Sequence, residues 1–139
     1  MPLFDAWART ILNSAIGGTA FTPPATLFFG LSTTTPNTDG TNVTEPASGG
    51  YARASSTNNT TNWPADVSGT ASKSNATVIN FPQASATWSA GANFTHVCVY
   101  ADPSGGANPL AFGALSTPKP VTSGDTASFA VSSVTWTLA

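Results

Sequence analysis

The sequence of 139 residues has little charge: Lys and Arg together number four, Asp and Glu number six, and these make up 7 % of the chain. A typical soluble domain carries about 25 % charged residues. A free monomer usually needs a well-charged surface to stay dispersed, and catalysis or metal binding needs several convergent ionisable groups. The low charge therefore argues against a solitary monomer and against an enzyme, and it favours a partner bound through apolar and uncharged polar contacts.

Basic residues in particular are too few for nucleic-acid binding. The formal net charge is -2, and the sequence pI is near 4.8. Neutralising phosphates requires a clustered basic patch, which four scattered cations do not form. We therefore expect no nucleic-acid partner.

Cysteine and long apolar runs are also scarce. The single Cys98 excludes a disulfide bond within the chain, so we expect folding in a reducing cytoplasm. No apolar run approaches the roughly 18 residues of a membrane span, and the segment from Met1 to Asp5 lacks the basic start of a secretory signal. We expect a protein that is neither secreted by that route nor inserted in a membrane.

The chain is instead rich in Thr, Ser and Asn, with 22, 16 and 10 copies. Short hydroxyl and amide side chains favour strand surfaces and turns over helices. Gly and Pro, with 12 and 11 copies, punctuate the sequence, and the 8 Phe, 4 Trp and 2 Tyr provide enough core material to argue against disorder. This composition predicts an all-β protein with many short strands.

Short apolar segments separated by turn residues predict the strands. They are residues 25–31, 51–55, 76–81, 94–101, 110–115 and 126–138, the last either continuous or broken near Ser132 and Ser133. We predict one domain over residues 1–139, in which residues 21–139 form an antiparallel β-sandwich of jelly-roll type. A long loop at about residues 32–50 has no apolar period and is a candidate contact element.

The clearest predicted strand is residues 94–101, because both of its faces are substantially apolar. Strict alternation groups the side chains into two faces: Phe94, His96, Cys98 and Tyr100 on one, and Thr95, Val97, Val99 and Ala101 on the other. Such a strand belongs in the middle of a sheet.

The N-terminal residues 1–20 are predicted as a helix or arm, with the helix over residues 2–16. Its apolar residues form two adjacent rows with a spacing of four: Leu3, Trp7, Ile11 and Ala15, and Phe4, Ala8, Leu12 and Ile16. One interpretation is that this broad face covers an open end of the protein's own sandwich. The other is that it docks on another subunit, which makes Phe4, Trp7 and Ile11 candidate interface residues.

Candidate catalytic and metal-binding residues are few. His96 and Cys98 lie two positions apart on one strand, where side chains stand roughly 6 to 7 Å from each other, too far for a nucleophile and its base. A metal site would need further ligands, and the nearest in sequence, Asp102, follows the strand end. We expect no catalytic residue, no metal and no cofactor, and we expect His96 and Cys98 to be packed side chains.

Paired carboxylates and exposed aromatic residues complete the list of candidates. The acidic residues are Asp5, Asp39, Glu45, Asp66, Asp102 and Asp125. Most occupy turn-like sequence in which Asp caps backbone amides, so a carboxylate pair for glycoside hydrolysis is not favoured. Trp63 and Trp88 lie in loop-like sequence and join the candidate interface residues. They could stack on sugars, anchor an interface or pack locally.

Several segments together resemble a family of small structural proteins of tailed phages and prophages. The resemblance rests on ordered pieces: Tyr51-Ala52-Arg53, Asn75 to Phe81-Pro82, Trp88, Phe94 to Asp102, Gly105-Gly106, Phe112 to Leu115, Lys119 and Gly124-Asp125. Members are often labelled tail fibre proteins, while others resemble capsid cement proteins of jelly-roll type. The resemblance covers about residues 25–139 and leaves the N-terminal helix outside it.

The resemblance implies a virion protein, and the sequence helps to choose its place on the particle. A distal fibre is typically a long trimer with repeats or a coiled-coil shaft, and this sequence has neither heptads nor internal repeats. We therefore expect a capsid cement (decoration) protein, folded in the host cytoplasm, that binds the outside of the mature shell and clamps neighbouring major capsid subunits. It would also pair with itself, as a homodimer rather than a trimer. Because few ion pairs are available to be screened, its attachment should depend weakly on salt.

Two other functions stay open. The alternative is a tail fibre or receptor-binding tail protein that recognises host surface glycans through Trp63 or Trp88. A third interpretation is a small hydrolase that uses Asp102 or Glu45. Copy number per particle discriminates the first two, because a cement protein is present in hundreds of copies and a tail protein in few.

Overall fold

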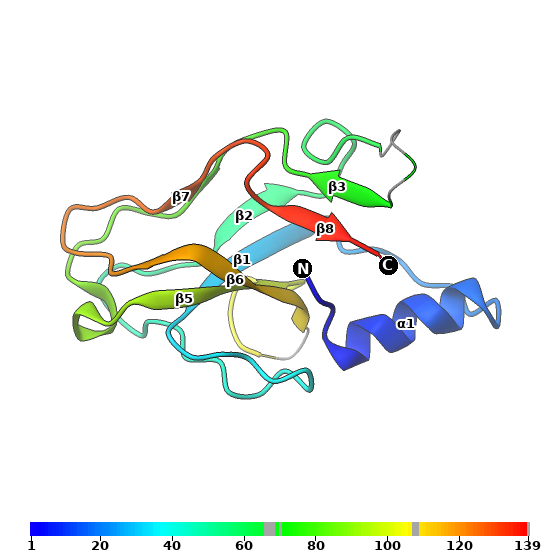
Figure 1. Ribbon diagram of the computed structural model, residues 1–139, viewed down its shortest axis with the longest axis horizontal. Helices are drawn as coiled ribbons and strands as arrows, with labels where there is room; N and C mark the ends of the chain where they lie inside the picture. The colour runs from blue at the N-terminus through cyan, green and yellow to red at the C-terminus, as the bar shows by residue number, and fades with distance from the viewer. Residues whose placement is uncertain (66–68, 70, 107–108, 139) are drawn as a thin grey trace.

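Figure 1 shows the computed structural model, which describes residues 1–65, 69, 71–106 and 109–138. Within these residues the chain forms one α-helix, one short 3-10 helix and eight strands. In chain order they are α1 (Asp5–Ala15), β1 (Thr26–Ser32), β2 (Ala54–Thr57), β3 (Ser72–Ser74), β4 (Ile79–Asn80), η1 (Trp88–Gly91), β5 (Phe94–Tyr100), β6 (Pro109–Lys119), β7 (Ser128–Phe129) and β8 (Thr135–Thr137). The prediction of a mostly β protein with a short N-terminal helix is confirmed.

The strands form one four-stranded sheet in the order β2-β1-β5-β6 and two small sheets, β3-β8 and β4-β7. All pairs are antiparallel, as predicted. The small sheets pack on one face of the large one, because the main core joins residues of β1 and β5 to residues of β4, β7 and β8. A jelly roll is not shown, and the described strands close no barrel, since β3, β4, β7 and β8 are too short to build a second continuous sheet.

The main core is rich in aromatic rings. Phe29 of β1 stacks on Trp63 with 6.0 Å between ring centroids. Trp88 makes edge contacts with Tyr51 and Phe94 at 5.1 and 6.3 Å. Such stacked and edge contacts are arrangements that aromatic pairs prefer, and they fill the space between the layers.

Strand β5 departs from strict alternation at its first residue. Val97 and Cys98 face opposite clusters, as predicted. Phe94 was expected on the face of Cys98 and instead joins the main core with Val97. The pairing of β5 with β6 shifts register between Phe94 and His96, and a bulge of this kind directs a side chain to the other face.

The first four residues are not helical, whereas the sequence predicted a helix from the second residue. They run beside the edge of β6, where Leu3 forms an isolated bridge with Ala111. The backbone N–H of Phe4 donates to the carbonyl of Leu110 at 3.0 Å. Phe4 is also 1 % exposed and packs on Phe112, with 4.8 Å between the rings. Strand pairing and the burial of this ring outweigh helix propensity, so α1 begins directly after it.

Other boundaries differ from the prediction because backbone pairing decided them. Strand β6 extends to Lys119 rather than residue 115, since it continues to pair with β5. The polar segment Ser72–Ser74 was predicted as loop and forms β3 through backbone pairing with β8. Residues 126–138 were predicted as one continuous strand or as two strands broken near Ser132 and Ser133. The structure has the broken form, with a turn that contains Ser132 at a φ of 61°.

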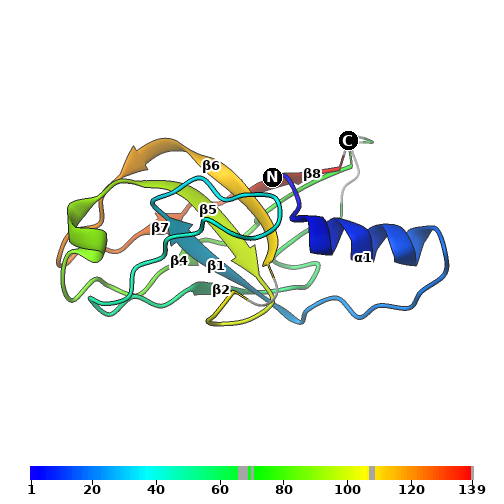
Figure 2. The same cartoon turned by 90° about the horizontal axis from the view of Figure 1, so that it is seen from below.

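Helix α1 projects from the β-sheet body, and both views show it extending away from the strands (Figures 1 and 2). None of its residues is buried, and no side chain caps its N-terminus. Among the described residues, no helix has the length and apolar character that crossing a membrane requires.

Candidate interaction surface

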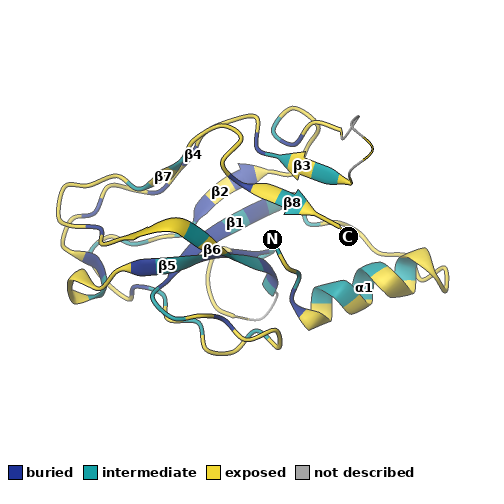
Figure 3. Ribbon diagram, in the orientation of Figure 1, coloured by how far each residue is buried: buried dark blue, intermediate teal, exposed yellow. Residues whose placement is uncertain are grey.

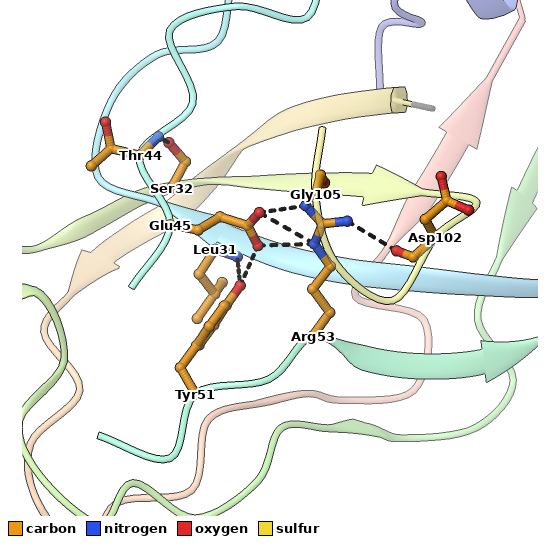
Figure 4. A network of polar contacts seen from close by, with 8 residues as sticks. All are labelled: Leu31, Ser32, Thr44, Glu45, Tyr51, Arg53, Asp102 and Gly105. Carbon is orange, nitrogen blue, oxygen red and sulfur yellow. Dashed lines mark hydrogen bonds and ion pairs between the residues drawn. The ribbon is translucent and has the colours of Figure 1, made fainter. Parts of the chain in front are cut away.

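An ion pair holds the long loop, residues 33–50, to the large sheet. Arg53 Nε donates to Glu45 Oε1 at 3.0 Å, and Arg53 Nη1 donates to the carbonyl of Asp102 at 2.9 Å (Figure 4). The side chains of Arg53 and Glu45 are 3 % and 20 % exposed. The pair therefore joins the loop, the approach to β2 and the turn after β5 at one point.

Tyr51 and Gly30 complete this arrangement, which we call the Glu45–Arg53 network. Tyr51 Oη donates to Glu45 Oε1 at 2.6 Å and accepts from the backbone N–H of Leu31 at 3.0 Å. A Cβ on Gly30 would collide with the same carboxylate oxygen, so a larger residue here would displace Glu45 from the network. Among the described residues every buried side-chain nitrogen or oxygen has a partner. The network therefore organises the loop.

A second apolar cluster lies on the opposite face of the large sheet from the main core. It contains Phe4, Cys98 and Tyr100, and the guanidinium carbon of Arg53 lies 3.4 Å from the centre of the Tyr100 ring, a cation–π contact. Burial raises the pKa of the Cys98 thiol to about 12. Burial likewise raises the pKa of Tyr100 and of Tyr51. The thiol is therefore protonated and unreactive at neutral pH.

These raised pKa values predict that alkaline pH destabilises the fold. Cys98, Tyr51 and Tyr100 stay neutral in the folded state, while the unfolded chain releases their protons from about pH 9 upward. The stabilisation is complete below that pH and is lost progressively as the pH rises towards the folded-state values. We expect the urea midpoint to be flat from about pH 7 to about pH 8 and to fall steadily towards about pH 11. A midpoint that stayed level over the whole range would contradict the burial of these groups.

Two exposed carboxylates, those of Asp39 and Asp125, act as turn caps, the role that the sequence predicted for most of the acidic residues. Asp39 accepts from the backbone N–H of Thr41 at 2.9 Å, and Asp125 accepts from that of Thr122 at 2.8 Å. Hydrogen bonds from these Thr side chains and backbones lower the pKa of both carboxyl groups. Asp66 lies outside the described residues.

His96 and the remaining ionisable groups do not assemble into a metal site in the described part of the chain. His96 is half-buried on β5, and its Nδ1 lies 2.9 Å from Thr95 Oγ1. No group of three or more His, Cys, Asp or Glu side chains is placed to hold an ion there.

Trp63 and Trp88 were candidate interface residues, and the structure places both in the core. They are 4 % and 0 % exposed, and their indole N–H groups donate to Ser56 Oγ at 3.2 Å and to the Gly49 carbonyl at 2.8 Å. Gly49 has a φ of 73°, and a Cβ there would lie 2.8 Å from Trp88 Cδ1. Local packing is therefore the role observed, because loops that look irregular in sequence fold over the sheet. Trp88 is fully enclosed, and the little surface that Trp63 keeps lines an apolar groove beside α1.

Trp7 and Ile11 lie at the surface, in an apolar groove between α1 and the β-sheet body. This helix groove has a volume of about 570 Å³, and its opposite wall includes Pro24, Trp136 and Leu138. Trp7 is half-buried and makes an edge contact with Phe21 at 5.6 Å. Phe4, the remaining candidate interface residue, is enclosed in the second cluster and does not reach this surface.

Exposed apolar side chains gather at the same end of the molecule. Leu12, Ile16 and Phe21, which we call the helix ridge, are 57, 77 and 37 % exposed. Figure 3 shows α1 with intermediate and exposed residues only. Leu138 in the groove wall is 57 % exposed. Trp136 and Leu138 lie within the last predicted strand, residues 126–138, but the sequence carried no signal that they would face the helix.

Comparison with known proteins gives one family. A family model described as Gp80, podophage GP4 fiber I protein gp80, matches residues 2–137. The match includes α1, which the resemblance in sequence had left outside. No curated protein matches the chain.

Proposed function

Because the chain belongs to the podophage GP4 fiber I protein gp80 family, we propose that it is a structural subunit of a phage tail fibre that works by assembly through α1. The observation that carries the proposal is the family match, which extends over residues 2–137 and so includes the projecting helix. The family is one of structural fibre proteins, and the chain is accordingly a virion component and not an enzyme.

The family supports the tail fibre over the capsid cement role that the composition favoured. Lack of heptads and repeats was the argument against a fibre, but it excludes only a long shaft built by this chain. A small β domain with a projecting helix is suited to a position on the tail where other chains provide the length. The low charge then fits an assembly contact that excludes water, wherever on the particle the contact lies.

Recognition of host glycans by Trp63 or Trp88 has no support in the geometry, since both rings are enclosed. Aromatic residues that bind sugars must present a ring face to solvent. We therefore place the role of this chain in fibre construction rather than in receptor binding.

Labelling of purified particles tests the proposed position. Antibody against the chain, detected by electron microscopy, should mark the tail, and quantitative gels should give few copies per particle relative to the major capsid protein. A phage that lacks α1 (residues 5–15 deleted) should lose the label while a major capsid band of normal intensity remains. Label over the whole shell, with copies in the hundreds, would instead support a cement protein and overturn the proposal.

A further inference from the structure

The end of the molecule that carries α1 holds most of its exposed apolar surface. Of the six large apolar side chains that are exposed in the described chain, four lie here: Leu12, Ile16, Phe21 and Leu138. Val78 and Val131 are the other two. Scattered apolar residues are normal on a monomer, whereas a contiguous apolar patch marks an interaction site.

We propose that this end is a homodimer interface, in which the helix ridge of each copy occupies the helix groove of the other across a two-fold axis. The proposal concerns how the chain pairs with itself and does not depend on where the pair sits on the virion.

The first argument for a second copy is self-complementarity. A two-fold interface uses the same patch on both partners, so the patch must contain both a projection and a recess. Leu12 and Ile16 form the projection on α1, and the row of Trp7 and Ile11 on the same helix lines the recess. A projection and a recess on one helix allow two copies to fit each other without any further element.

The second argument is electrostatic. Among the 18 residues that line the groove, the charged side chain is that of Lys73, whose ammonium lies 3.5 Å from the carbonyl of Trp63. Along α1 the charged residues are Asp5 and Arg9, of opposite sign. A groove lined mainly by apolar and uncharged polar side chains favours an apolar partner, and the ridge of this same chain meets that requirement with little charge to desolvate.

The third argument concerns size and helix stability. A standard interface buries about 800 Å² on each partner, and the groove of about 570 Å³ together with the exposed side chains of the ridge and Leu138 is surface that a second copy can cover. An isolated helix shorter than about 12–15 residues is marginal in water. α1 has 11 residues, no buried side chain and no side-chain cap, so contact with a second copy provides the packing that it lacks.

Sedimentation of surface variants tests the proposal. Ile16→Ser and Leu12→Ser each remove an exposed side chain of the ridge, and Val78→Ser, at 50 % exposure and outside the patch, is the matched control. The wild-type chain should sediment as a dimer. A two-fold axis places the substituted residue in the interface twice, once from each copy. Ile16→Ser should therefore raise the dimer dissociation constant on the order of a hundredfold. Val78→Ser should leave the constant unchanged. The constant should vary little between low and high salt, since few charges take part.

Disulfide trapping tests the arrangement itself, using the fact that the native Cys98 is buried. Chains with Ile16→Cys mixed with chains with Asn59→Cys, a groove residue, should form mixed disulfide dimers under mild oxidation. Chains with Val78→Cys in place of Ile16→Cys should not. A wild-type monomer at all concentrations, a trimer, or a dimer that Ile16→Ser leaves intact would overturn the proposal. Circular dichroism confirms that each variant is folded.

Discussion

Replacing Trp88 with alanine should lower the free energy of unfolding by about 3–5 kcal/mol, the range for truncating a large buried aromatic side chain. The ring is 0 % exposed and contacts Tyr51, Phe81 and Phe94. Its indole N–H donates to the carbonyl of Gly49, which would be left without this partner. Urea titration followed by far-ultraviolet circular dichroism measures the change without depending on tryptophan fluorescence.

Trp7→Ala provides the matched control for this prediction, because Trp7 is half-buried at the groove. Its removal should cost less than half as much stability in the monomer while weakening assembly. Equal losses of unfolding free energy in the two variants would contradict this prediction, because they would place Trp7 in the core beside Trp88.

Glu45→Ala should be the second large effect, with a cost of about 3 kcal/mol. Breaking a buried ion pair typically costs about 3–5 kcal/mol because the remaining charge stays buried without its partner. The lower end applies because the Glu45 side chain keeps 20 % exposure and Arg53 keeps its bond to the carbonyl of Asp102. Thermal and urea unfolding measure the loss, and faster proteolysis within residues 33–50 should accompany it, since the loop loses its anchor.

A double-variant cycle separates this pair from general damage to the loop. Arg53→Met combined with Glu45→Ala should cost clearly less than the sum of the two single changes, because no unpaired charge remains. Asp39→Asn, on an exposed turn of the same loop, should change stability by less than about 0.5 kcal/mol. Strictly additive losses for the pair would contradict the interaction seen in Figure 4.

The strands that the sequence predicted best are those whose own side chains require burial. β1 and β5 appear within a residue or so of the predicted segments, because both faces of each are apolar and must be covered. β3 was missed because Ser72–Ser74 contains no apolar residue and becomes a strand by pairing with β8, which is far away in the chain.

At the candidate site, too, the sequence predicted the features set by local residues and missed those set by long-range contacts. The periodicity of α1 predicted an apolar face with Trp7 and Ile11 on it, and these do line the groove. Trp63 and Trp88 were assigned to loops; Trp63 lies in a bend and Trp88 begins η1, but nothing local indicated that these segments fold over the large sheet. Phe94 was placed by strict alternation, which fails at a bulge that depends on the partner strand.

The amino-acid sequence by itself determined the β class, the scarcity of charge and of reactive groups, and the amphipathic N-terminal helix, because composition and periodicity act locally along the chain. Only the tertiary structure decided which aromatic rings are enclosed, that Glu45 and Arg53 meet over Gly30, and that α1 faces Trp136 across a groove. These features are long-range contacts between segments far apart in sequence, and their energies depend on which surfaces the whole fold brings together. The low charge therefore indicated an apolar partner, and the structure shows exposed apolar side chains and an apolar groove beside α1.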